Sequence, residues 1–135
     1  MSSSPAKDIL EILETAGIGK YGKLLQRRVS RQMKDPTMYL LAETAASPNE
    51  PVHQERCDHH RVTVEVVSGY GEKGAKNGSD MAFRAYINLF FLMDHTAKDG
   101  TFYPVIYAVS PPSESTIGEY TSYSFSVEMT RYIGG

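Results

Sequence analysis

The sequence has few of the features that would tie a protein to a membrane, a disulfide scaffold or a nucleic acid. Its single cysteine, Cys57, excludes an intrachain disulfide. The longest apolar run, residues 86–93, is far shorter than the roughly 20 residues that a membrane-spanning helix needs. No N-terminal stretch combines a basic end with a sufficiently long apolar core for a signal peptide, so we expect a soluble protein that folds inside the cell. A formal net charge of −2 gives no overall attraction to nucleic acid.

Motifs for catalysis are missing as well. Serines, histidines and acidic residues are plentiful, but no serine lies in a G-x-S-x-G nucleophile elbow. The carboxylates form no close pair on a common face of a predicted element. We therefore expect no catalytic residues and no cofactor, and we predict that the protein is not an enzyme.

The length and the apolar periodicity predict one domain with a mixed fold. A chain of 135 residues suits one hydrophobic core, so residues 1–135 are expected to form a single domain. Ser4 and Pro5 begin an apolar-striped helix that ends at Gly17, and Ser79 begins a second helix that runs to about His95. Strands are expected at residues 24–29, 37–44, 60–68, 101–110 and 122–130. The order α-β-β-β-α-β-β predicts an α+β fold with two helices on one face of a mixed or antiparallel sheet of four or five strands.

Two strands carry the clearest information. Val62, Val64 and Val66 alternate with polar residues, which predicts a half-buried strand. The last strand has the strictest alternation in the chain, with apolar residues at positions 123, 125, 127 and 129. Pro104 interrupts an otherwise strand-like run and predicts either an edge strand or a bulge.

A G-x-G-x-x-G pattern at Gly69, Gly71 and Gly74 raises the possibility of a nucleotide-binding loop. A strand precedes it and a helix follows, but we place the helix start at Ser79, too late for its amide groups to meet a pyrophosphate. No second strand with an acidic residue follows at the required distance. We therefore interpret residues 68–78 as a long mobile surface loop. A second copy of the pattern, at residues 17–22, follows a helix and is interpreted as a cap and a loop.

Two other clusters have a chemical and a structural interpretation. Zinc accepts histidine and cysteine, and His53, Cys57 and either His59 or His60 would be the ligands if a metal bound. The spacing matches no usual pair of ligand knuckles, and residues 59 and 60 point to opposite faces of a strand, so we predict no metal. The stretch 20–34 holds six basic residues and no acidic one. We interpret it as a solvated face or a subunit contact, with a nucleic-acid strip as the alternative.

The order of these features resembles the tail terminator or minor capsid proteins, which join heads to tails in long-tailed phages and prophages. The resemblance lies in the helix ending in "AGIGKYGK", the strand and proline-containing loop "MYLLAETAASPNEP", and the strand "VTVEVV". It continues through "AFRAYINLFFLM", the turn "KDGTFY" and the alternating strand "YSFSVEMTRYI". It covers nearly the whole chain in order. The basic, longer "LLQRRVSRQMKD" and the histidines of "CDHH" depart from the usual pattern.

The resemblance implies a structural protein of the virion, located at the head-proximal neck of the tail and assembled in the host cytoplasm. Such a protein forms a homo-hexameric ring that stops polymerisation of the tail tube protein and presents a surface to the head-completion or connector protein. Genomic DNA would only pass through its pore, and no membrane is involved. The expected interface residues are Arg27, Arg28, Arg31, Tyr70, Lys73 and Lys76. A head–tail joining protein of the same fold is the alternative, and a small nucleotide-binding protein using Gly69–Gly74 is a remote one.

Overall fold

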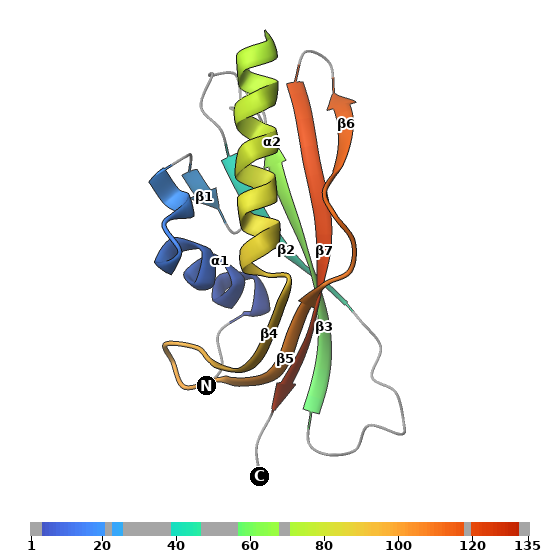
Figure 1. Cartoon of the computed structure of the whole chain (residues 1–135). Helices are drawn as coiled ribbons and strands as arrows, with labels where there is room; N and C mark the ends of the chain where they lie inside the picture. Colours follow the sequence, from blue (N-terminus) through green and yellow to red (C-terminus); the bar gives the residue numbers. More distant parts are fainter. Residues whose placement is uncertain are drawn as a thin grey trace.

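The chain forms an α+β fold in which a long, curved sheet packs against two helices (Figure 1). The computed structural model describes residues 4–20, 23–25, 39–46, 57–67, 71–117 and 120–132. The helices are α1 (Pro5–Thr15), the 3-10 turn η1 (Ile18–Lys20) and α2 (Gly71–Asn88). The strands are β1 (Lys23–Leu25), β2 (Tyr39–Ala46), β3 (Cys57–Val67), β4 (Phe91–Thr96), β5 (Phe102–Ala108), β6 (Ser113–Ile117) and β7 (Tyr120–Tyr132).

The sheet has the order β1-β2-β3-β7-β5-β4, with β6 paired to β7 outside this path. Along the path β2-β3-β7-β5-β4 each strand is antiparallel to the next, while β1 runs parallel to β2. One edge of β7 pairs with β3, and its other edge pairs first with β6 and then with β5. The predicted α+β class with a mixed sheet is therefore confirmed. Strand β6 lies between the last two predicted strands, where the sequence predicted none, so the list of predicted strands was incomplete.

The apolar alternation of β3 and β7 builds the core. Their register sets Val62 opposite Val127, Val64 opposite Phe125 and Val66 opposite Tyr123, so these side chains share one face of the sheet. All six are buried, and they form one cluster with apolar residues of both helices. Helix α2 runs beside β7 and β3, and α1 packs against β2 and β3 (Figure 1). The half-buried strand and the alternating last strand were both predicted from sequence.

Helix α1 is the predicted first helix. Ser4 caps it by accepting a hydrogen bond from the Lys7 amide at 3.2 Å, and Pro5 occupies the first helical turn. Ile9 and Leu13 are fully buried in the core. The helix ends before Gly17, whose φ of 86° is a conformation that glycine adopts without steric cost.

Helix α2 differs from the prediction at both ends. It begins at Gly71 and not at Ser79, so residues 71–78 are helical and do not form a surface loop. It ends at Asn88 instead of near His95, and Phe91–Thr96 leaves the helix to form β4. Pairing of β4 with β5 satisfies the backbone groups on one side of this segment, and that tertiary interaction outweighs the helical spacing of its apolar residues.

Pro104 lies in β5, between β4 and β7. The predicted bulge is confirmed, because the register of β5 against β7 shifts between Phe102 and Val105. The alternative of an edge position was wrong, since β5 is an interior strand. Strand β2 begins two residues later than predicted, at Tyr39, and β3 extends back to Cys57. Of the predicted strand 24–29, residues 26–29 lie outside the described part of the chain.

Candidate functional site: a buried polar cluster and an apolar surface

The residues expected to form interfaces are only partly covered by the structure. Lys76 is exposed on α2, and Lys73 belongs to the same helix. Both were expected on a mobile loop and instead lie on a regular element. The remaining candidates, Arg27, Arg28, Arg31 and Tyr70, lie outside the described residues.

The glycine pattern now has a different structural setting. Because α2 begins at Gly71, the helix starts inside the pattern, and our first reason for excluding a nucleotide-binding turn was wrong. Topology still separates it from a dinucleotide-binding unit, which requires two parallel strands joined by the helix. Helix α2 joins β3 to β4, and three successive antiparallel pairings from β3 to β4 make these two strands antiparallel. Gly69 lies outside the described residues.

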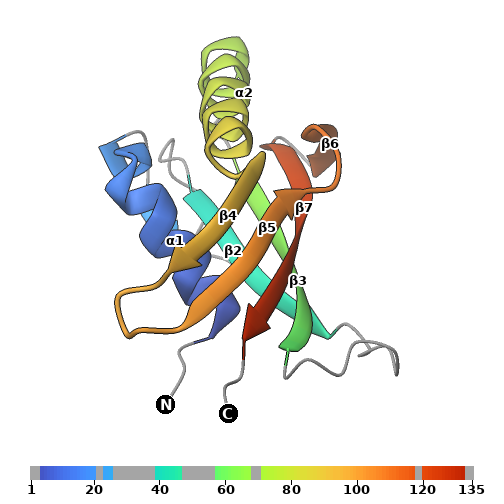
Figure 2. The same ribbon diagram turned by 60° about the horizontal axis from the view of Figure 1, so that its bottom comes forward.

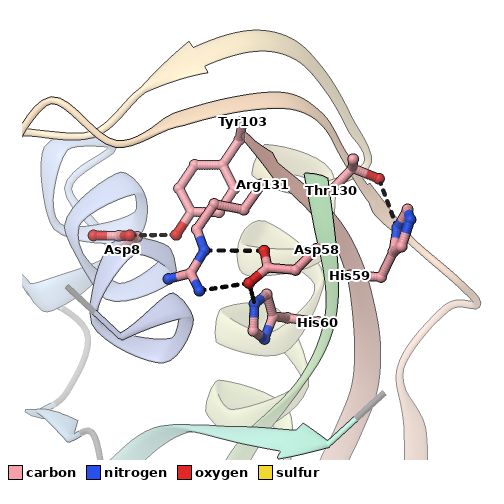
Figure 3. A network of polar contacts seen from close by, with 7 residues as sticks. All are labelled: Asp8, Asp58, His59, His60, Tyr103, Thr130 and Arg131. Carbon is pink, nitrogen blue, oxygen red and sulfur yellow. Dashed lines mark hydrogen bonds and ion pairs between the residues drawn. The ribbon is translucent and has the colours of Figure 1, made fainter. Parts of the chain in front are cut away.

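The histidines near the start of β3 point to opposite faces of the sheet, as predicted (Figure 3). The His59 Nδ1 atom lies 3.2 Å from Oγ1 of Thr130, across the strand pair. The His60 Nε2 atom lies 3.0 Å from Oδ2 of Asp58, on the other face. In the part of the chain that the structure describes, no three histidine, cysteine or acidic residues are grouped to hold a metal ion. His53 lies outside that part.

A polar cluster, fully buried at Asp8 and Tyr103 and partly buried at Asp58 and Arg131, holds one contact between α1 and β5 and one between β3 and β7 (Figure 3). Tyr103 of β5 donates a hydrogen bond from its hydroxyl group to Oδ2 of Asp8 on α1. Both residues are completely buried. Burial, together with the hydrogen bond to Asp8 and the negative charge of that carboxylate, raises the pKa of Tyr103 far above its ordinary value of 10.

The second half of the cluster is an ion pair between neighbouring strands. Arg131 of β7 donates to Asp58 of β3 through Nε at 3.1 Å and through a terminal nitrogen at 2.7 Å, a two-pronged contact. Burial opposes ionisation of Asp58, but the hydrogen bonds from Arg131 and His60 outweigh it and lower the pKa of this carboxyl group. The hydrogen bond to Asp58 also raises the pKa of Arg131.

The geometry of this cluster favours a structural role. A catalytic tyrosine needs a lowered pKa to act as a base or nucleophile near neutral pH, and Tyr103 has a raised one. Asp58 is held ionised by its donors on the neighbouring strand. The cluster instead connects α1, β3, β5 and β7. Sequence analysis missed it, although one signal was present: Asp58 and His60 occupy the same alternating positions as the buried valines of β3.

A pocket of about 300 Å³ opens beside this cluster, between α1 and the turn that joins β4 to β5. Its lining consists of Glu11, Ile12, Thr15, His95, Thr96, Ala97 and Lys98. The His95 ring packs against Tyr103, with the ring centroids 6.3 Å apart. The carboxylate of Glu11 and the ammonium group of Lys98 belong to opposite walls, so the pocket has no charge of one sign that would select an ion.

Large apolar side chains gather at the opposite end of β4. Seven of them are between 41% and 69% exposed, and we call them the apolar surface: Phe83, Ile87, Phe90, Phe91, Met93, Tyr107 and Val109. They lie on two sides of the molecule: Phe83 and Ile87 are exposed on the outer side of α2, whereas Phe91, Met93 and Tyr107 lie on the sheet face away from the helices, because their neighbours Leu92 and Ile106 face the core. Rings in edge-to-face contact link Phe83 through Tyr86 to Phe90, and the amide of Ala108 donates to the carbonyl of Phe90. Phe91 is paired with Tyr107 across β4 and β5.

Comparison with known proteins adds no identification. No protein-family model matches the sequence, and no significant match is found among curated proteins. Among the helices that the structure describes, none has the length and apolar character to cross a membrane. The function is therefore inferred from the residues of this chain alone.

Proposed function

We propose that this protein is a ring-forming tail terminator of a long-tailed phage or prophage. In this role it caps the head-proximal end of the tail tube, stops tube polymerisation and provides the interface for the head connector. The order of sequence features along the whole chain suggests the class. The observation that carries the proposal is the apolar surface, because a subunit of a ring must bury a large patch against its neighbour.

The size of the apolar surface supports assembly. Aromatic side chains bury about 150–250 Å² each, so the four aromatic members, each about half exposed, offer on the order of 400 Å². The isoleucine, methionine and valine add to this area. The total reaches the size of the largest apolar patch on a typical monomer, roughly 300–600 Å², which is often functional.

Purified protein provides the test, with two variants that each introduce two charges at a different place on the surface. Ile87→Lys combined with Phe90→Lys introduces two charges into the apolar surface, and Ser115→Lys with Thr116→Lys introduces two on the exposed strand β6. We expect six-fold rings of the wild type in negative-stain microscopy and native mass spectrometry, alone or on purified tail tubes. The first variant should remain a folded monomer, and the second should still form rings. A wild type that neither forms rings nor binds tail ends contradicts the proposal.

A head–tail joining protein of the same fold remains the alternative. It would share the ring and the apolar surface, and would differ in which neighbour it contacts. Binding to purified tail tubes but not to connector-bearing heads favours the terminator. The reverse result favours the joining protein.

The start of α2 inside the glycine pattern keeps nucleotide binding as a second candidate. Thermal unfolding in the presence of nucleotides separates the two. A ligand at 100 times its dissociation constant adds about 2.7 kcal/mol to the free energy of unfolding, which raises the melting temperature by several degrees. We expect no such rise. A clear rise in a strictly monomeric protein would favour the nucleotide-binding candidate and contradict the ring.

A further inference from the structure

Strand β4 forms one margin of the described sheet (Figure 2). It pairs with β5 on one side, and no strand of the described residues pairs with its other side. The peptide groups along an unpaired edge can bond to an added strand, and natural proteins usually protect such an edge with charge, proline or a bulge.

The backbone groups that face outward can be assigned from the register. Hydrogen-bonded and non-hydrogen-bonded pairs alternate along an antiparallel ladder. The Ala108 amide donates to the Phe90 carbonyl at 3.1 Å, so Phe90 and Ala108 form a hydrogen-bonded pair. The next hydrogen-bonded pair along the ladder is Leu92 with Ile106, and the pairs of Phe91 and Met93 are non-hydrogen-bonded. The amide and carbonyl groups of Phe91 and Met93 therefore point away from β5, toward the open edge.

Part of this short edge is exposed and uncharged. Residues 91–93 include no charge and no proline, and the side chains of Phe91 and Met93 are 55% and 65% exposed. The irregularity comes only after them, at Asp94, which has a φ of 52°. Asp94 lies opposite Pro104, which lacks the amide that the next hydrogen-bonded pair would use, and the register of β4 against β5 skips this position. The regular, apolar part of the edge is thus confined to Phe91, Leu92 and Met93.

We infer that a second copy of this chain adds a strand to the open edge of β4. The outward amide and carbonyl groups of Phe91 and Met93 bond to that strand, and the exposed side chains of these two residues are covered in the same contact. A second copy fits because its own β4 carries the same uncharged edge, so the two edges can pair antiparallel without like-charge repulsion. This inference deepens the proposed function and rests on its self-assembly.

Two substitutions, Met93→Pro and Met93→Val, distinguish association through strand addition from association through apolar side chains alone. Both replace Met93 by a smaller apolar side chain, but only Met93→Pro removes the outward amide, and an edge strand tolerates proline where its amide faces solvent. Wild-type protein and Met93→Val should self-associate with dissociation constants within about tenfold of each other. Met93→Pro should bind at least about 30-fold more weakly than Met93→Val, because it also leaves a carbonyl of the added strand without its donor. Analytical ultracentrifugation measures all three.

A second variant keeps the test decisive if Met93→Pro does not fold. Phe91→Lys keeps every backbone donor and places a charge on the edge, so it should also abolish association while preserving the thermal unfolding of the monomer. Association that persists unchanged in the folded variants overturns the inference, as does a wild type that stays monomeric at about 0.5 mM.

The result also distinguishes this inference from the proposed function. A two-fold dimer that dissociates on Met93→Pro supports strand addition and contradicts the ring. A six-fold ring that survives both substitutions supports the ring and contradicts strand addition at β4.

Discussion

Replacing Tyr103 by phenylalanine should destabilise the protein although it removes a single oxygen atom. Phenylalanine keeps the ring that packs in the core, so the main loss is the hydrogen bond to the buried carboxylate of Asp8. Hydrogen bonds to charged groups contribute about 1.5–3 kcal/mol, because the charged partner is left poorly solvated when the donor is removed. For a domain of this size, that loss lowers the melting temperature by about 5–12 °C.

Urea and thermal unfolding of purified monomer test this prediction, with Tyr107→Phe as the matched control. Tyr107 lies on the same strand, but its side chain is 41% exposed, so its loss should cost less than about 0.5 kcal/mol. In a double-mutant cycle, Asp8→Ala and Tyr103→Phe should show a coupling of about 1 kcal/mol or more. A cost below about 0.5 kcal/mol for Tyr103→Phe, or additive effects in the cycle, would refute the reasoning.

The raised pKa of Tyr103 adds a dependence on alkaline pH. Below pH 10, the pKa of the unfolded tyrosine, this residue is protonated in both states and its contribution to stability is complete. Above that pH the unfolded chain loses the proton while the folded chain keeps it, so the free energy of unfolding falls as the pH rises. The slope between pH 10 and 11 should be smaller in Tyr103→Phe than in the wild type.

Three further predictions concern other parts of the molecule. Because the pKa of Asp58 is lower in the folded state, its ionisation stabilises the protein at pH values above the ordinary pKa of 3.8, and this stabilisation is lost as the pH falls through the folded pKa. Asp58→Asn should therefore flatten the acid unfolding profile between about pH 5 and 2. An unchanged profile would contradict this role. At Asp94, whose φ is 52°, a β-branched side chain is strained, so Asp94→Val should cost about 1–2 kcal/mol in urea unfolding while Asp94→Gly should cost nothing; equal stabilities would show that the strain is absent. Replacing Arg27, Arg28 and Arg31 together by glutamate should leave a folded monomer that neither forms rings nor joins tails, and unchanged assembly would remove this basic stretch from the interface.

The sequence predicted those parts of the fold in which one local pattern also matches the tertiary environment. The alternation in β3 and β7 is strong because one face of each strand is buried along its whole apolar length. The first helix was predicted because Ser4, Pro5 and Gly17 mark both of its ends. In these segments, propensity, capping and burial all favour the same structure.

Prediction failed where local preference and tertiary contacts disagree. Glycine costs about 1 kcal/mol in a helix interior, so the glycines at 71, 74 and 78 favoured a loop. Helix α2 nevertheless includes them, and residues such as Met81 and Ala85 in its later turns are fully buried against the sheet. The run 89–93 has helical spacing, but a turn at Leu89 and pairing with β5 make it a strand. No local pattern encodes a partner that lies further along the chain.

The polar cluster and the apolar surface were missed for a related reason. Asp8 and Tyr103 are 95 positions apart, so their contact depends on the complete fold. Charged residues in core-facing positions of β3 were a usable signal, since a buried charge needs a partner. The apolar surface gave no such signal, because most of its residues belong to α2, β4 and the turn between them, whose boundaries were placed differently from sequence.

The position of β7 determines the order in which the sheet can be completed. The pairs β2–β3 and β4–β5 form from neighbouring segments, but β7, the last of the described strands to be synthesised, lies between them. Val62 and Val127 meet across 65 positions of sequence, so joining the two halves requires closure of a long loop, which is a slow step. Until the ribosome has released this segment, β3 and β5 both have an open edge. During synthesis the nascent chain is therefore most exposed to incorrect strand pairing immediately before β7 emerges.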